Sequence, residues 1–235
     1  MTALLLGLIG LPIGLALDAL VVRLAVAPDD LEEAPAAERP SLHDEDGSLV
    51  LHHGVGWPAW ARRLLLAAMT AGLLAIAAAR YDDASHLAVA GAYVCVLLVC
   101  AATDILVYRV PNAVTYPAML GALIAGAALP GANIVEVIAG GLLAGGILFV
   151  PVLLTGGVGM GMGDVKLVTF VGLALGFTNA VPALLLMALA GGAVAVFLLV
   201  TGLRRRGDPI PYAPFISVGA LATLLWQGTA FVRLA

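Results

Sequence analysis

Four acidic residues lie inside or at the ends of long apolar stretches: Asp18, Asp104, Glu136 and Asp164. An ionisable side chain in such a position is costly to bury and marks a functional site by default. Two carboxylates that share a site of low dielectric constant do not ionise together easily, so the pair holds a proton between them. One carboxylate can then take a proton from water while the other protonates a carbonyl group. This is the chemistry of an aspartic protease, and it needs neither a metal nor a covalent intermediate.

The sequence before Asp164 has an unusual composition. Five of the eight residues in 156–163 are glycine, which disfavours a helix. Non-helical backbone at membrane depth survives only where protein buries it or where it lines a wet cavity, and glycine lets an extended peptide approach closely. Asp164 would then open a helix, where the dipole favours its ionised form. A glycine-rich turn capped by the aspartate is the simpler alternative, but a second acid at the same level favours a functional site.

The second acid is Asp104, which is predicted to close an apolar helix seven residues before Pro111. Pro111 is expected to start the next helix. Taken alone, the position of Asp104 is equally consistent with a solvated acid at a helix end that pairs with Arg109. No serine or cysteine has a plausible histidine partner at this level, which disfavours nucleophilic catalysis.

The composition identifies the setting of these acids as a membrane. Of the 235 residues, 62% are hydrophobic and 11% are charged, and the mean hydropathy is +1.08. Soluble domains have roughly 45–50% apolar and about 25% charged residues. The chain is therefore predicted to be an all-α integral membrane protein in a lipid bilayer. A net charge of −4 argues against a nucleic-acid partner.

Apolar segments near the length of about 20 residues that a spanning helix needs predict about eight transmembrane helices. The stretch 165–203 is too long for one helix, and a break is expected at Phe177–Pro182. The predicted helices cover approximately 2–27, 62–79, 86–104, 113–129, 134–155, the two parts of 165–203, and 212–232.

Positive charge predicts the orientation of the bundle. With eight helices, nine of the eleven basic residues fall on one side, and only Arg80 and Arg233 fall on the other. Because basic residues concentrate in cytoplasmic loops, the side with Asp104 and Asp164 should face the cytoplasm and both termini should lie outside. The predicted organisation is a first helix at 1–27, a cytoplasmic loop at 28–61, and a seven-helix membrane core at 62–235.

The loop at 28–61 carries eight acidic residues and several prolines, which predicts a flexible linker. Its His43, Asp44, His52 and His53 are interpreted as polar loop residues and not as metal ligands. The two cysteines, Cys95 and Cys100, lie in an apolar helix and form no CxxC pair, so a structural zinc site of the usual sulfur type is excluded.

Four segments in order along the chain resemble the type IV prepilin peptidases. Residues 161–166, Gly-Met-Gly-Asp-Val-Lys, resemble the GxGD motif of that family. Asp104 followed by Pro111 and Asn112 resembles the family's other aspartate. Residues Gly14, Asp18 and Arg23 have the spacing of a Gly, Asn and Arg set in the first helix, with aspartate in place of asparagine. Residues 210–215, Ile-Pro-Tyr-Ala-Pro-Phe, with Gly219 resemble a late family segment.

The resemblance implies an endopeptidase of the bacterial inner membrane. It would remove the basic leader from type IV prepilins or related pseudopilins at the cytoplasmic face, with Asp104 and Asp164 as the catalytic pair and no cofactor for proteolysis. Gly161 and Gly163 would shape the loop that presents Asp164, and Lys166 would orient a carboxylate or bind substrate, or serve only as a positive-inside anchor. The acidic loop could attract the basic leader, although a solvated linker is the simpler interpretation. The sequence makes no prediction of oligomeric state.

One departure from the family pattern concerns a second activity. Many members carry two CxxC pairs in the first cytoplasmic loop, and many also methylate the new N-terminus with S-adenosylmethionine. The loop of this chain has no cysteine, so methylation is the weaker expectation.

Other classes also use acids among apolar helices. An ion-coupled transporter would place acids near the midplane between inverted repeats, and no repeat is evident in the sequence. A presenilin-like protease also uses GxGD but usually has tyrosine before the first aspartate, where this chain has Thr103; the triplet at 182–184 is attributed to chance. An inactive structural bundle is the third alternative. Asp18 could tune the site as a third acid, or it could pair with Arg23, five residues further on. A structural polar contact within the bundle is the favoured expectation.

Overall fold

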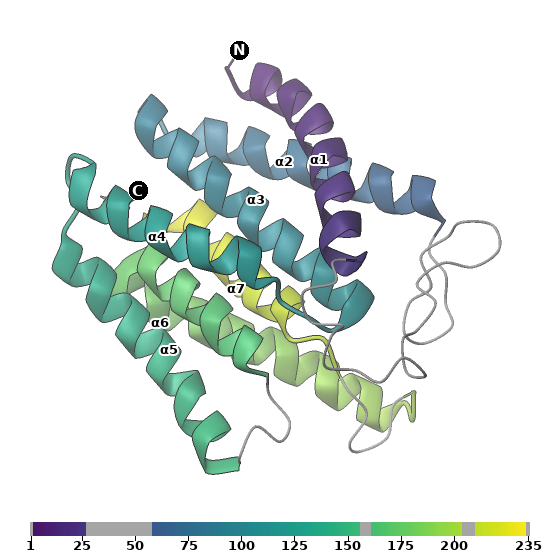
Figure 1. Ribbon diagram of the computed structural model, residues 1–235. Coiled ribbons are helices and arrows are strands. Elements are labelled where there is room, and N and C mark those ends of the chain that lie inside the picture. Colours follow the sequence, from purple (N-terminus) through teal and green to yellow (C-terminus); the bar gives the residue numbers. More distant parts are fainter. Residues whose placement is uncertain (1, 27–57, 156–160, 204–209, 234–235) are drawn as a thin grey trace.

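The computed structural model describes residues 2–26, 58–155, 161–203 and 210–233. They form a helical bundle with one short hairpin (Figure 1). The two strands of the hairpin pair antiparallel, with Thr229 opposite Val232. The elements in chain order are α1 (Thr2–Val26), α2 (Ala59–Arg80), α3 (Ala84–Val107), α4 (Asn112–Ala128), α5 (Ile134–Thr155), α6 (Met162–Val200), α7 (Ala213–Trp226), β1 (Gly228–Thr229) and β2 (Val232–Arg233).

Five of the described helices are long and apolar enough to cross a bilayer: α1, α2, α3, α5 and α6. Helices α4 and α7 are apolar but have only 17 and 14 residues. A helical membrane protein is thus confirmed, whereas the predicted count of about eight spanning helices is not supported. The count was too high for two reasons. Helices α4 and α7 are shorter than a bilayer requires, and the two predicted parts of 165–203 both belong to the single helix α6.

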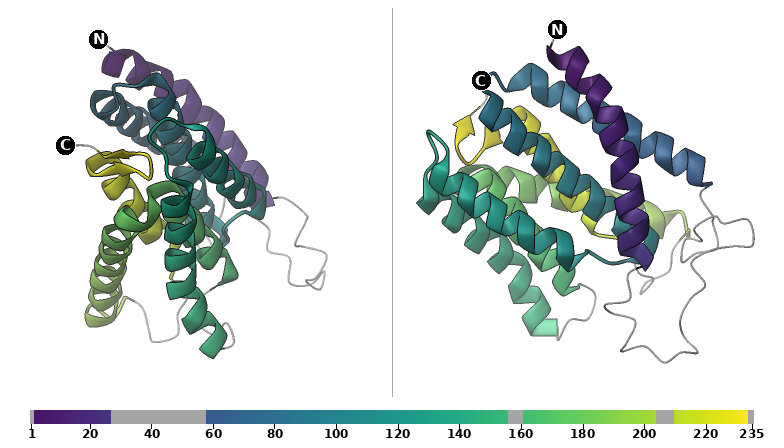
Figure 2. Two further views of the ribbon diagram at one scale, coloured as in Figure 1. Left: turned by 90° about the vertical axis from the view of Figure 1, so that its left-hand side faces the viewer. Right: turned by 45° about the horizontal axis from the view of Figure 1, so that its top comes forward.

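Helix α6 folds back on itself at Gly176, whose φ of 76° and ψ of 170° are not helical. The arm before this residue ends at the hairpin, where the Ala230 N–H donates to the Ala174 carbonyl at 3.1 Å. The arm after it runs back until Gly191 packs on Phe215, near the start of α7. Figure 2 shows the two arms of the green helix diverging from this bend. The break predicted at Phe177–Pro182 begins one residue later, so it was close to the observed bend.

The bundle has two distinct ends. At the hairpin end, defined here by Arg80, Trp226 and the β1–β2 hairpin, the Arg80 guanidinium donates to the carbonyl groups of Leu225 at 3.2 Å and Trp226 at 3.1 Å. At the aspartate end, defined by Asp104, Asp164 and Ala213, α3 ends and α6 and α7 begin. Helix α1 runs antiparallel to α2, so its first residues lie toward the hairpin end together with the end of the chain (Figure 1).

Glycine brings neighbouring helices into backbone contact at both flanks of the bundle. A Cβ atom on Gly14 of α1 would lie 2.4 Å from the Cα of Ala67 in α2, and one on Gly140 of α5 would lie 2.3 Å from the carbonyl oxygen of Gly172 in α6. Small residues drive such close packing because lipid supplies little hydrophobic force between helices. The glycine contacts therefore fix how α1 meets α2 and how α5 meets the first arm of α6.

The core between these flanks joins α3, α6 and α7. The ring of Tyr93 meets the edge of the fully buried Phe170 at a centroid distance of 5.4 Å. The Ser217 hydroxyl of α7 donates to the Leu97 carbonyl of α3 at 3.0 Å. The first contact joins α3 to α6, and the second holds α7 beside α3, so the start of α7 lies next to the last turns of α3.

Several predicted boundaries differ from the observed ones by three residues or more. The third helix was expected to end at residue 104 but ends at Val107, and the sixth was expected from residue 165 but begins at Met162. The last helix was expected to reach residue 232 but ends at Trp226, since Gly228 has a φ of 100° and the chain then turns into the hairpin. The second helix was expected from Arg62 but begins at Ala59, after the extended Pro58. Most of the predicted acidic loop, including His43, Asp44, His52 and His53, lies outside the described residues.

Replacing Gly14 with alanine should destabilise the bundle by about 1–3 kcal/mol, because the new Cβ forces α1 away from α2. Gly72→Ala in α2 is the matched control, since a Cβ there meets nothing within 4 Å. Thermal unfolding of both variants in detergent tests this expectation. Equal melting midpoints for the two variants would contradict the packing account.

Candidate active site

Asp104 lies in the last turn of α3 and is only 5% exposed. Its Oδ2 atom accepts a hydrogen bond of 2.9 Å from the backbone N–H of Ala213, the first residue of α7. The backbone N–H of Tyr212 also donates to this carboxyl group. The first N–H groups of a helix have no partner within the helix and attract negative charge. The start of α7 is thus a hydrogen-bonding site for the Asp104 carboxylate.

Asp164 lies in the first turn of α6 and is 8% exposed. Its carboxyl group accepts a hydrogen bond from the backbone N–H of Gly161, and its own N–H donates to the Gly161 carbonyl at 3.2 Å. It is near enough to Asp104 for the two charges to interact. The structure therefore brings the two predicted aspartates together. The Asp104 carboxylate meets the N-terminus of α7, and Asp164 lies at the N-terminus of α6.

The two glycines of the GxGD segment have different surroundings. A Cβ on Gly163 would lie 3.1 Å from the Cβ of Val110, so a side chain there would push α6 away from the segment that follows Asp104. Gly161 has extended backbone, with φ −80° and ψ 151°, and a Cβ there would make only ordinary contacts, the nearest at 3.8 Å from the backbone nitrogen of Gly163. Steric crowding thus explains why residue 163 is glycine, but it does not explain why residue 161 is glycine. The preceding residues 156–160 lie outside the described part of the chain.

Lys166 meets two residues of α4 at the aspartate end. Its Nζ atom donates to Oδ1 of Asn112 at 2.9 Å and lies 5.0 Å from the centroid of the Tyr116 ring. Pro111 is the N-cap of α4 and so places Asn112 at the start of that helix. The predicted supporting residues Pro111, Asn112 and Lys166 are therefore neighbours, and Lys166 connects α6 to α4.

Asp18 is paired with α2. Its carboxylate binds the guanidinium of Arg62 through Nε at 2.5 Å and Nη2 at 3.3 Å, and Nε of Arg63 at 3.3 Å. Asp18 is 1% exposed and Arg62 is 7% exposed. The preferred expectation of a structural polar contact agrees with this geometry, whereas Arg23 is exposed on α1.

The sequence analysis gave no role to Arg62 or to the backbone of Tyr212 and Ala213. A signal for Arg62 was nevertheless present in the sequence. Arg62 stands among apolar residues of α2, and a buried arginine requires an acidic partner such as Asp18. Tyr212 and Ala213 lie in the late segment singled out by resemblance. Pro214 follows them at the start of α7, and a proline there indicates a helix N-terminus with free N–H groups.

The helices around the acids are short for a membrane. Helix α7 has 14 residues, and α6 has the same length from Met162 to Leu175, before its bend. At 1.5 Å per residue each segment is roughly 21 Å long, against about 30 Å for the hydrocarbon core. One end of each segment must therefore lie below a membrane surface or thin the bilayer locally. A buried pair of acids can activate water against a peptide carbonyl group.

The described residues offer no alternative metal or thiol chemistry at this site. No group of three or more His, Cys, Asp or Glu side chains gathers among them in a way that could hold a metal ion. Cys95 and Cys100 are free thiols on α3, half-buried and buried respectively. The triplet at 182–184 lies on the second arm of α6, where Ala183 backs onto Gly219 of α7, and not beside the acids.

Comparison with known proteins identifies relatives of this chain. Residues 91–196, which include both aspartates, match the model of the Type IV leader peptidase family. A 177-residue segment is 33% identical to a prepilin leader peptidase/N-methyltransferase of Burkholderia pseudomallei (strain 1026b), covering 73% of this chain and 57% of that protein. A protein of the same name from Bacillus subtilis (strain 168) is 30% identical over 162 residues, 67% of this chain and 63% of that protein.

A third relative, from Aeromonas hydrophila, has the same name and is 31% identical over 120 residues, which are 49% of this chain and 41% of that protein. The chain thus matches less than two thirds of the length of these relatives. No solved structure gives a significant match.

Asp18→Ala should destabilise the protein by about 3–5 kcal/mol, because it leaves the buried Arg62 without its charged partner. The double variant Asp18→Ala with Arg62→Leu should recover much of this loss, since it removes the uncompensated charge as well. Thermal unfolding of the single and double variants measures both effects. If the double variant were less stable than Asp18→Ala, the ion pair would not be the reason for the loss.

Proposed function

We propose that the chain, whose residues 91–196 match the model of the Type IV leader peptidase family, is a member of that family and an aspartic endopeptidase of the membrane. It hydrolyses the bond between the basic leader and the body of a type IV prepilin or a related pseudopilin. The observation that carries this proposal is the pair of buried aspartates, Asp104 and Asp164, whose charges interact at one end of the bundle.

In this proposal the two carboxyl groups divide the work of peptide hydrolysis. Asp104 has one oxygen, Oδ2, bound by the Ala213 N–H, so its other oxygen is available to accept a proton from the attacking water. Asp164 donates its proton to the scissile carbonyl oxygen, which gives a tetrahedral diol. When the C–N bond breaks, Asp104 passes the proton that it took from water to the leaving amine, and Asp164 takes a proton back from a diol hydroxyl. The reaction uses no metal and no other cofactor. The Ala213 N–H positions Asp104 without touching the substrate.

The distribution of basic residues supports an active site that faces the cytoplasm. Among the described residues, the aspartate end carries Arg23, Arg62, Arg63, Arg109 and Lys166, while the hairpin end carries Arg80 and Arg233. Basic residues concentrate on the cytoplasmic side of bacterial membrane proteins. We therefore place the aspartate end at the cytoplasmic face of the inner membrane and both termini on the outside.

The supporting residues act through the positions of the helices. Gly163 allows α6 to approach Val110, and the contact of Lys166 with Asn112 holds α6 against α4. Both contacts set the position of Asp164 relative to Asp104. The eight acidic residues at 28–61 remain a candidate for attracting a basic leader by long-range electrostatics. Neutralising them should slow cleavage at low salt if they have that role.

Asp104→Asn and Asp164→Asn should each lower the rate of prepilin cleavage by about 10²–10⁴-fold or more, because general acid–base catalysis requires both groups. Purified protein in detergent or lipid would be incubated with a prepilin, and mass spectrometry would identify the new N-terminus. Asp82→Asn, an exposed acid before α3, is the matched control and should cleave at the wild-type rate. Cleavage that survives either active-site substitution would overturn the mechanism.

A second activity, methylation of the new N-terminus with S-adenosylmethionine, is suggested by the names of the relatives. The absence of paired cysteines from this chain makes it the less favoured part of the proposal. Supplying S-adenosylmethionine in the cleavage reaction should leave the mass of the product unchanged. A product heavier by one methyl group would establish the second activity.

A further inference from the structure

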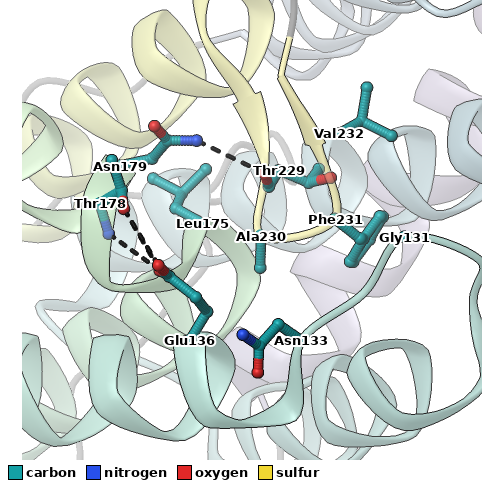
Figure 3. Close-up of a pocket in the computed structure, with 10 residues that line it drawn as sticks. All are labelled: Gly131, Asn133, Glu136, Leu175, Thr178, Asn179, Thr229, Ala230, Phe231 and Val232. Carbon is teal, nitrogen blue, oxygen red and sulfur yellow. Dashed lines mark hydrogen bonds between the residues drawn. The ribbon is translucent and has the colours of Figure 1, made fainter.

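A polar cavity lies at the hairpin end of the bundle, away from both aspartates (Figure 3). Its volume is about 340 Å³, and its walls come from the start of α5, the bend of α6 and the β1–β2 hairpin. Leu175, one of its lining residues, follows Asp164 by eleven positions on the same arm of α6. Eleven residues of helix span roughly 16 Å, so this cavity is separate from the candidate active site.

One wall of the cavity carries the carboxylate of Glu136. It accepts hydrogen bonds from the N–H of Thr178 at 3.3 Å and from the Thr178 hydroxyl at 3.2 Å. Both donors are neutral groups. None of the ten residues that line the cavity is Lys, Arg or His. Among the residues whose side chains the structure describes, the lining therefore contains an acidic group but no cation to balance it.

The opposite wall carries a buried polar atom that lacks a partner. Thr229 is 1% exposed, and its Oγ1 atom has no hydrogen-bond partner. The neighbouring Asn179 is also buried, and its Nδ2 atom reaches the carbonyl groups of Gly228 and Thr229 only at 3.5 and 3.4 Å. In native proteins a buried, unpaired polar atom calls for an explanation, and a bound water or ion is one of the usual ones. A ligand that donates hydrogen bonds would satisfy Thr229.

We propose that this cavity binds a small organic primary amine, with its ammonium group against Glu136 and a hydrogen bond to Thr229. An ammonium group supplies both the positive charge and the donors that the lining lacks. The size favours an organic molecule over a bare metal ion, since ligand pockets begin at about 300 Å³. No group of three or more metal-ligating side chains lies among the described residues. The amine can be a free solute or the ethanolamine headgroup of a lipid.

The test measures binding of ethanolamine to the purified full chain in detergent, by thermal shift and by saturation-transfer NMR at constant ionic strength. Ethylene glycol, which has a hydroxyl in place of the ammonium, is the matched ligand control. The same protein in phosphatidylcholine vesicles with or without phosphatidylethanolamine distinguishes the two sources. Phosphatidylcholine has a quaternary nitrogen without N–H donors and should not bind. A saturable response to ethanolamine identifies a free amine, and a response only to phosphatidylethanolamine identifies the headgroup.

Two variants connect the response to the cavity. Glu136→Gln should weaken amine binding by about ten-fold or more, because a charge-assisted hydrogen bond becomes a neutral one. Thr229→Val should weaken it several-fold without lowering the melting midpoint of the unliganded protein, since the lost hydroxyl has no partner there. Asp82→Asn, an acid at the same end but outside the cavity, should bind as wild type does. Absence of a saturable response in both detergent and vesicles, an equal response to ethylene glycol, or unchanged binding by Glu136→Gln would overturn the proposal.

Discussion

Burying two carboxylates at one end of an apolar bundle requires hydrogen-bond donors for each of them, and this requirement governs how the surrounding helices are arranged. An ionisable group removed from water without such partners would be too costly to keep charged. Asp164 obtains a donor from the segment that starts its own helix, through the Gly161 N–H. Asp104 lies near the end of α3 and has no such segment, so its donor comes from the first residue of α7. Helix α7 must therefore begin where α3 ends.

The other contacts of the bundle maintain this arrangement. Ser217 fastens α7 to α3, and the glycine contact between Gly140 and Gly172 fixes the arm of α6 that carries Asp164. At Gly176 that arm turns back toward the aspartate end, so one continuous apolar stretch packs against α5 and then against α7. The short helices and the bend together bury the two acids within the protein and keep them at the aspartate end of the bundle.

Local patterns in the sequence predicted much of the fold. The range 134–155 predicted for a helix coincides with α5, and Pro111 does mark the start of α4. The acids at the two helix ends were found because charged residues stand out in apolar segments. The fine structure after Trp226 was missed, since the two-residue strands are too short to produce an alternating pattern.

Contacts between distant segments were not predictable in the same way. Arg23 lies five residues from Asp18, but Arg62, 44 residues away, is the partner that the packing of α1 on α2 brings into contact. The donor for Asp104 is a backbone N–H at residue 213, and every residue type except proline supplies such a group, so no side chain marks it. These tertiary relations depend on how helices pair, which hydrophobicity alone does not encode.

The central claim is that Asp104 and Asp164 belong to one site. It is tested most directly by cross-linking the two positions in native membranes, independently of any substrate. The full chain would carry Asp104→Cys and Asp164→Cys, with Cys95→Ala and Cys100→Ala to remove the native thiols, and would be treated with a short thiol-reactive cross-linker. The account predicts efficient cross-linking of this pair and none when Asp104→Cys is combined with Glu136→Cys at the other end. Equal cross-linking of the two pairs, or none in either, would contradict it.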